Sequence, residues 1–113
     1  MKLITAVIKP FKLEDVQEAL ADLDVRGLTV TEVTGAGRQG GHNEIYRGAE
    51  YTITLLPKVR LELVVEDHEV GSVVEAIRAA ATTGRIGDGK LWVTPVEDLV
   101  RLRTGEHGSD ALR

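Results

Sequence analysis

The stretch KVRLELVVED, residues 58–67, decides the fold. Two sets of side chains alternate along it, Val59, Leu61, Leu63 and Val65 against Arg60, Glu62 and Val64. Successive side chains of an extended chain point to opposite faces of a sheet. We therefore predict a strand with one face on the core and the other largely toward solvent or a partner.

Three more strands and two helices are predicted around this stretch. Strands are expected at Lys2–Ile8, which ends before Pro10, at 28–37 and at 90–96. A helix over 12–25, ending at Gly27, follows from the three- and four-residue spacing of Leu13, Val16, Leu20 and Leu23. A second helix over 67–84, with Gly84 as its C-cap, follows from Val70, Val73, Val74 and Ile77.

The resulting order, βαββαβ, is that of the ferredoxin-like fold. This α+β arrangement has an antiparallel sheet with both helices on one face. A chain of 113 residues is about the size of a single domain, here 1–113. Residues 96–103 could pair as a fifth strand or form an irregular extension, and the tail 104–113 has too little apolar content to predict order.

The connection 37–57 is too long for an ordinary hairpin turn between the second and third strands. It could be a floppy insertion, a hairpin extended beyond the sheet, or a functional loop. Both tyrosines of the chain, Tyr46 and Tyr51, lie in it and outside any apolar run, so we do not expect them in the core.

Composition excludes several classes of function. The chain has no cysteine, and its three histidines lack a metal-binding spacing, so we expect neither disulfides nor a structural metal site. The net charge of -4 argues against nucleic-acid binding. The N-terminal apolar patch is short and is broken at Lys9-Pro10, and no long apolar run follows. We expect a soluble, cytoplasmic protein.

Three short elements combine glycine with basic residues: GAGRQGG at 35–41, TGRIGDGK at 83–90 and RLR at 101–103. Each of the first two could be a simple turn, the second a helix C-cap followed by a tight Asp-Gly hairpin turn. The third would place Arg101 and Arg103 on one side of an extended segment. If the three elements converge, backbone N–H groups and cations would form a polyphosphate site.

These motifs carry a family resemblance. GAGRQGGHNEIYRGAEYTITLLPK together with TTGRIGDGKLWVTPVEDLVRLRTGE resembles the PII signal-transduction proteins of nitrogen regulation, and the likeness extends over nearly the whole chain. The resemblance implies a ferredoxin-like homotrimer with nucleotide clefts between subunits. It also implies a T-loop at about 37–57, a B-loop at about 82–90 and a C-terminal arm at about 101–113.

The resemblance assigns ATP and ADP to one cleft. Thr29, Glu62 and Val64 would line the adenine pocket with Gly35 close by. The phosphates would be approached by Gly37, Arg38, Gln39, Gly87, Asp88, Gly89 and Lys90, and clamped by Arg101 and Arg103.

The second ligand that the resemblance implies is 2-oxoglutarate, which binds after Mg-ATP through a shared Mg²⁺. Gln39 would supply the protein oxygen to the metal, and Lys58 would pair with the distal carboxylate. The pocket would be closed by backbone near Gly37, Gly41 and Gly87, with Lys9 nearby. Because the two ligands share one metal, each should raise the affinity for the other.

The T-loop would contact target proteins, and Tyr51 matches the apex tyrosine that is nucleotidylated in the family. The resemblance thus implies a regulatory protein rather than an enzyme. Its possible targets are an ammonium transporter, a glutamine synthetase nucleotidyltransferase or an arginine-pathway kinase, with membrane contact only through the transporter. Gly40 stands where many members have a basic residue, which leaves the conformational response of the T-loop less firmly predicted than nucleotide binding.

Two other classes of function remain open on the residues alone. A slow ATPase could use Asp88, Glu62 or Glu50, but no nucleophile is paired with a base. An RNA-binding βαββαβ module would require stacking aromatic residues on the central strands, and the chain has few aromatic residues.

Overall fold

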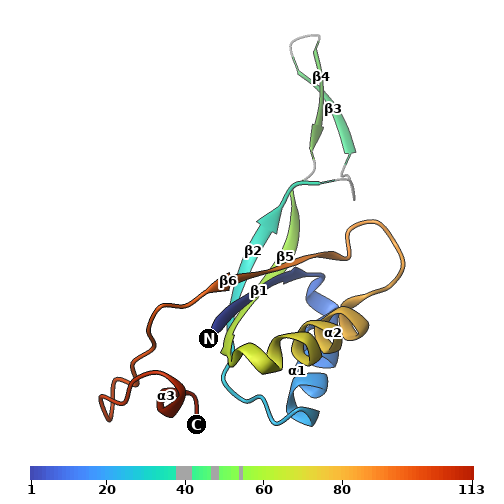
Figure 1. The fold of residues 1–113 in the computed structure, drawn as a ribbon. Helices are drawn as coiled ribbons and strands as arrows, with labels where there is room; N and C mark the ends of the chain where they lie inside the picture. The colour runs from blue at the N-terminus through green and yellow to red at the C-terminus, as the bar shows by residue number, and fades with distance from the viewer. Residues whose placement is uncertain (38–41, 47–48, 54) are drawn as a thin grey trace.

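The structure is a computed structural model that describes residues 1–37, 42–46, 49–53 and 55–113, with only the backbone described within 42–53. Figure 1 shows its strands and helices. The strands are β1 (Lys2–Ile8), β2 (Thr29–Gly35), β3 (His42–Tyr46), β4 (Ala49–Ile53), β5 (Leu56–Val65) and β6 (Gly89–Pro95). The helices are α1 (Leu13–Asp22), α2 (Val70–Ala81) and the short α3 (Ser109–Leu112), and single turns of 3-10 helix, Pro10–Lys12 and Asp67–Glu69, precede α1 and α2.

Four of the strands form one antiparallel sheet in the order β2-β5-β1-β6. Strand β1 lies between β5 and β6, and its pairing runs from Lys2, opposite Val65 and Pro95, to Ile8, opposite Val59 and Gly89. This is the predicted ferredoxin-like order, so the fold prediction is confirmed.

The core lies between this sheet and the two long helices, which cover one face of it (Figure 1). The predicted alternation in β5 is confirmed, because Val59, Leu61, Leu63 and Val65 are all buried. Both helices add to this core, α1 through Val16 and Leu20 and α2 through Val73, Ile77 and Ala81.

The long connection between β2 and β5 contains a separate two-stranded hairpin, β3-β4. This hairpin extends beyond the main sheet and is drawn beyond the ends of β2 and β5 in Figure 1, so the prediction of an extended hairpin is confirmed. Tyr51 lies in β4 opposite Glu44, and Tyr46 in β3 pairs with Ala49.

Two predicted helix ends were wrong. Helix α1 ends at Asp22, and Asp24 takes the left-handed conformation, with φ of 60°. The N–H groups of Asp24 and Val25 donate to the carbonyls of Ala21 and Leu20, which closes the helix before Gly27 is reached. Aspartate tolerates this conformation better than most residues.

Helix α2 ends at Ala81 with Thr82, not Gly84, as its C-cap. The C-terminal tail, which was not predicted to be ordered, also has defined structure. The N–H of Gly108 donates to the carbonyl of Leu99, Val100 forms an isolated bridge with His107, and α3 follows. These contacts are local and polar, so apolar content did not reveal them.

No helix in the described ranges is long and apolar enough to cross a membrane.

The position of Leu61 makes a test of the packing possible, since this side chain is fully buried in β5. We expect Leu61→Ala to lower the free energy of unfolding by about 2–5 kcal/mol, because it leaves a cavity between sheet and helices. Leu55→Ala is the matched control, because Leu55 is 63% exposed, and its effect should stay within about 0.5 kcal/mol. Urea denaturation measures both, and equal effects would contradict the assignment of the core.

Candidate functional site

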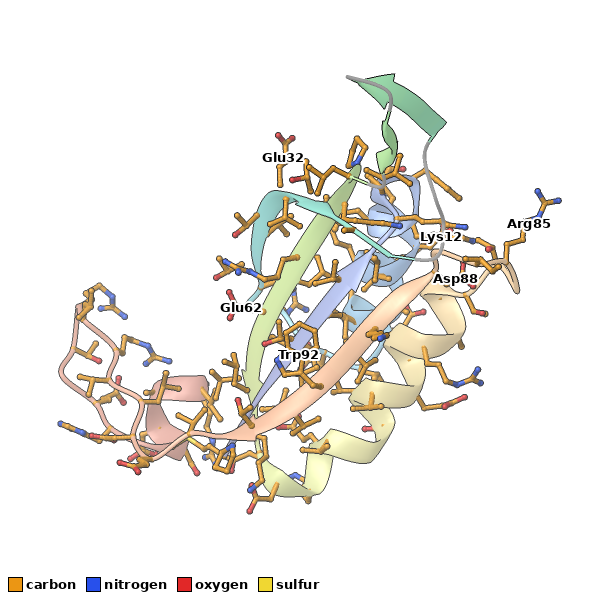
Figure 2. All side chains as sticks on the ribbon, turned by 90° about the horizontal axis from the view of Figure 1, so that it is seen from above. Lys12, Glu32, Glu62, Arg85, Asp88 and Trp92 are labelled. Atoms are coloured by element: carbon orange, nitrogen blue, oxygen red, sulfur yellow. The ribbon has the colours of Figure 1, made fainter. Side chains whose placement is uncertain are left out.

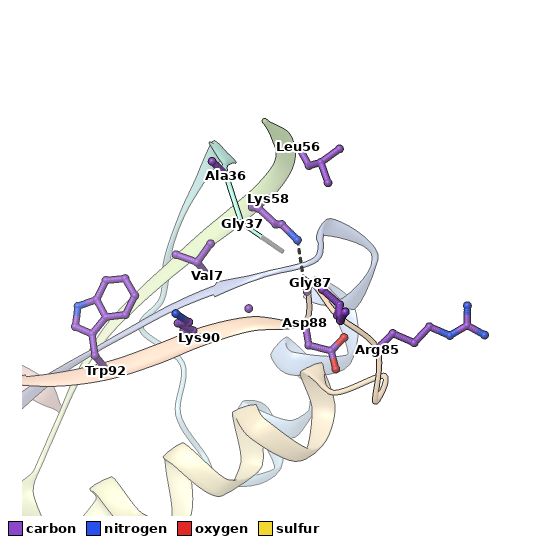
Figure 3. A pocket seen from close by; sticks show the side chains of 13 residues that line it. Val7, Ala36, Gly37, Leu56, Lys58, Arg85, Gly87, Asp88, Lys90 and Trp92 are labelled. Carbon is purple, nitrogen blue, oxygen red and sulfur yellow. Dashed lines mark hydrogen bonds between the residues drawn. The ribbon is translucent and has the colours of Figure 1, made fainter. Parts of the chain in front are cut away.

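An open cleft of about 740 Å³ lies at the end of the sheet where β1 leads into Lys9 (Figure 3). Three segments form it: the end of β2, the start of β5, and the loop between α2 and β6. Its lining residues include four of the glycines singled out in the sequence, Gly35, Gly37, Gly87 and Gly89, and the cations Lys58 and Lys90. Glycine backbone and positive charge therefore meet at one place, as an anion site requires.

The loop 82–88 owes its shape to glycine. Gly84, Gly87 and Gly89 all have positive φ, at 80°, 97° and 104°. Most other residues avoid this region because the Cβ atom clashes with the backbone. The loop joins a helix to a strand, so it is not the hairpin turn that Asp-Gly can indicate in isolation.

The carboxylate of Asp88 stabilises this loop by accepting hydrogen bonds from other residues of the loop. Its Oδ2 accepts hydrogen bonds from the backbone N–H of Thr83 at 2.7 Å and of Gly84 at 2.9 Å. Its Oδ1 accepts a hydrogen bond from the Thr83 hydroxyl and lies 3.2 Å from Nζ of Lys9. The carboxylate is thus turned into its own loop, where its oxygens already have partners.

These contacts stabilise the charged form of Asp88. The hydrogen bonds from the Thr83 hydroxyl and N–H, with Lys9 and Gly84 adding to them, hold the pKa of Asp88 far below its ordinary value. A carboxylate whose pKa is lowered by folding stabilises the fold above its unfolded pKa and loses that contribution only as pH falls through the lowered value. Asp88 is therefore ionised throughout the neutral range.

Two lysines lie beside Asp88 and are largely buried. Lys9 is 8% exposed and Lys58 is 9% exposed, and Nζ of Lys58 donates to the carbonyl of Gly87 at 2.7 Å (Figure 3). Burial, followed by the positive charge of Lys9, lowers the pKa of Lys58, while Asp88 opposes this shift. Both lysines line a neighbouring hollow, where two partly desolvated ammonium groups are suited to a carboxylate ligand.

The other predicted nucleotide contacts lie elsewhere. Thr29, Glu62 and Val64 line a second hollow near the opposite end of the sheet, together with Leu99, Ala111 and Leu112 of the C-terminal segment. In Figure 2, Glu62 and Asp88 are labelled at well-separated positions. The predicted adenine-binding residues and the predicted phosphate-binding loop are thus separate within one chain.

The arginines of the C-terminal arm do not reach the cleft in this chain. They follow β6, whose far end at Pro95 pairs with Lys2, whereas the cleft lies at the Gly89 end. The prediction of an extended RLR segment was wrong, because residues 102–104 form a turn. Nη1 of Arg101 lies 2.7 Å from Oε1 of Glu106, and its Nη2 donates to the backbone oxygens of Ala111 and Arg113, which bends the arm back on itself.

Some predicted site residues lie outside the residues that the structure describes. Arg38, Gln39 and Gly41 are not among the described residues, and for Tyr51 only the backbone in β4 is described.

Sequence reasoning missed several residues of the cleft, namely Val7, Ala36, Leu56, Arg85, Ile86 and Trp92. Trp92 had a detectable signal, since it lies two residues after Lys90 in a strand and must share its face. Arg85 stands inside the quoted TGRIGDGK motif, although Figure 3 shows its side chain directed away from the cleft.

Comparison with known proteins identifies the family. Residues 1–106 match the family described as "Nitrogen regulatory protein P-II". The chain is 61% identical to the nitrogen regulatory protein P-II of Azospirillum brasilense over 112 residues, which cover 99% of this chain and 100% of that protein. With the same coverage it is 58% identical to the P-II protein of Rhodospirillum rubrum and 53% identical to the nitrogen regulatory protein GlnK of Escherichia coli.

The chain belongs to the P-II family of nitrogen regulatory proteins. Its role is therefore in nitrogen signal transduction. In this P-II protein the cleft beside Lys9 and Lys58 and the hollow beside Thr29 are the two regions where ligand contacts are predicted.

The glycines of the loop offer a matched pair of substitutions. A Cβ atom on Gly89 would lie 1.8 Å from the carbonyl oxygen of Val7, whereas one on Gly84 would have nothing within 4 Å. We expect Gly89→Ala to lower the free energy of unfolding by about 3 kcal/mol or more, through the clash and the positive φ together. Gly84→Ala should cost about 1 kcal/mol from its positive φ alone. Thermal and urea unfolding compare the two variants, and similar costs would contradict the close approach of β6 to β1.

Proposed function

We propose that this P-II protein is a non-enzymatic sensor that binds ATP or ADP in clefts between the subunits of a homotrimer. With Mg-ATP bound it also takes 2-oxoglutarate, and the ligands set how the hairpin segment engages nitrogen-assimilation targets. The observation that carries the proposal is the separation of the predicted nucleotide contacts into two groups at opposite ends of one sheet.

The first group suits the phosphates. The cleft brings the backbone of Gly37, Gly87 and Gly89 together with the charges of Lys58 and Lys90. A triphosphate is a compact polyanion, and backbone donors with a few cations are the usual means of binding one. The volume of the cleft lies within the usual range for ligand pockets.

The second group suits the base. Thr29 and Glu62 are paired across β2 and β5, and Val64 offers an apolar side chain two residues further along. Thr29 and Gly35 are the two ends of β2 and are six residues apart, which corresponds to roughly 20 Å along a strand. A nucleotide that contacts both groups would therefore bind between two chains, with one group supplied by each.

The sheet face that the helices leave uncovered is the proposed contact surface between those chains. Trp92, on the face opposite the helices, is 47% exposed, and Val7 and Val64 on the same face are half-buried. A sheet face with exposed aromatic and aliphatic groups favours burial against another subunit. Packing three such faces together would place the Thr29 hollow and the C-terminal arm of one subunit against the phosphate cleft of the next.

The lysine pair supports a dicarboxylate ligand. Lys58 and Lys9 present ammonium groups beside the loop 82–90, where the carboxylates of 2-oxoglutarate would find charge-assisted partners. The oxygens of Asp88, the carboxylate in the cleft lining, already accept several hydrogen bonds. A Mg²⁺ ion would therefore take its oxygens from phosphates, from 2-oxoglutarate and from the amide of Gln39, in keeping with the preference of Mg²⁺ for few protein ligands.

The hairpin β3-β4 supplies a surface for targets. It is a small strand pair outside the main sheet, with Tyr51 in β4 as the proposed site of nucleotidylation. Bulk and negative charge added to that side chain would oppose docking of a partner. We place the protein in the cytoplasm, with an ammonium transporter, a nucleotidyltransferase of glutamine synthetase or an arginine-pathway kinase as candidate targets.

Titration calorimetry tests this proposal. We expect ATP to bind the wild-type protein, and 2-oxoglutarate to bind only when Mg-ATP is present. Lys58→Ala should weaken 2-oxoglutarate binding at least about tenfold, because a charge-assisted contact is lost. Lys2→Ala is the matched control and should leave both affinities unchanged, because Lys2 pairs with Asp67 at the other end of β1. Absence of ATP binding to the wild-type protein would contradict the proposal.

A further inference from the structure

Asp88 contacts two different segments, the start of its own loop and Lys9, through different oxygens. Oδ2 accepts hydrogen bonds from the backbone N–H groups of Thr83 and Gly84, at 2.7 and 2.9 Å, and so fixes the start of the loop 82–88. Oδ1 lies 3.2 Å from Nζ of Lys9, which extends from the end of β1. One carboxylate thus joins the loop expected at the phosphates to the lysines expected at 2-oxoglutarate.

The adjacent contact reinforces this link. Lys58 reaches the same loop through the carbonyl of Gly87, at 2.7 Å, so both lysines are tied to neighbouring residues of one short segment. Lys9 also donates to the Thr83 hydroxyl at 3.3 Å, and that hydroxyl in turn contacts Asp88. A ligand that draws either ammonium group toward itself must alter the contacts that hold the loop.

We propose that Asp88 is a positioning residue that couples the two ligands, so that 2-oxoglutarate engaging Lys9 and Lys58 tightens the loop on the nucleotide. This inference rests on the proposed function and extends it. In this account Asp88 does not touch either ligand. Its Oδ2 keeps the loop in its binding conformation, and its Oδ1 makes that conformation depend on the position of Lys9.

The chain contains a matched control for this role. Asp67 is also a carboxylate paired with a lysine, with Oδ1 3.0 Å from Nζ of Lys2, and it lies at the opposite end of β1 from Lys9. Asp67→Asn removes the same charge and the same kind of ion pair without touching the cleft. Asp88→Asn keeps an oxygen that can accept from the loop but removes the negative charge beside Lys9.

The test is the factor by which saturating 2-oxoglutarate lowers the Kd of Mg-ATP, measured by calorimetry. We expect a factor of at least about five in the wild-type protein and in Asp67→Asn, and a factor at least about threefold smaller in Asp88→Asn, in which only the coupling through the shared Mg²⁺ would remain. An unchanged factor in Asp88→Asn would overturn the inference while leaving the proposed function in place.

Two other results would also overturn the inference. Loss of all nucleotide binding in folded Asp88→Asn would make Asp88 a direct contact rather than a positioning residue. Failure of the wild-type protein to bind Mg-ATP would remove the proposed function and this inference with it.

Hydrogen exchange on the wild-type protein gives a readout that does not depend on the folding of a variant. The amides of Thr83 and Gly84 donate to Asp88. We expect their exchange to slow when 2-oxoglutarate is added to the protein already saturated with Mg-ATP. Unchanged exchange of both amides, alongside confirmed binding of both ligands, would contradict the coupling through Asp88.

Discussion

The pairing of β1 with β6 is the constraint on which the rest of the site depends. Gly89 packs so close to Val7 that a single added carbon would lie 1.8 Å from a carbonyl oxygen. That approach fixes where β6 begins, and the end of α2 fixes where the loop 82–88 starts. Between these two fixed points, glycines with positive φ and the hydrogen bonds to the carboxylate of Asp88 determine the backbone conformation of the loop. Lys9 meets that loop because it follows β1, the neighbour of β6 in the sheet, and the long side chain of Lys58 reaches the loop from β5, the next strand.

The same sheet register separates the two groups of predicted nucleotide contacts within one chain. Strand β2 is long enough to carry Gly35 at the glycine-lined cleft and Thr29 at the other hollow, and the arm with Arg101 leaves β6 at the far end. Because the helices cover only one face, the opposite face remains available to a second chain (Figure 1). Assembly and ligand binding are therefore parts of one proposal: the surface that joins the subunits would also bring the two groups of contacts together.

Much of the fold could be predicted from sequence because alternation and helical spacing report burial directly. Val59, Leu61 and Ile77 are buried as their positions in the pattern indicate. Local contacts were harder to predict. Asp24 takes the left-handed conformation that closes helix α1 before Gly27 is reached. The RLR segment, predicted to be extended, turns at residues 102–104, with Arg101 paired to Glu106. For the site, glycine and charge marked two of the segments that line the cleft, residues 35–37 and 85–90. The structural role of Asp88 could not be predicted, because it depends on Lys9, a residue far away in sequence.

The central claim, that each nucleotide site combines two chains, is tested most directly by mixing variants. Lys90→Ala damages the cleft and Arg101→Ala damages the arm, so we expect each to bind ATP weakly alone. When the two are refolded together, the account predicts that about one high-affinity site returns per mixed trimer, formed by the intact cleft of one chain and the intact arm of another. If every site were built within a single chain, each would still carry a defect. Binding no tighter in the mixture than in the parent variants would contradict the account.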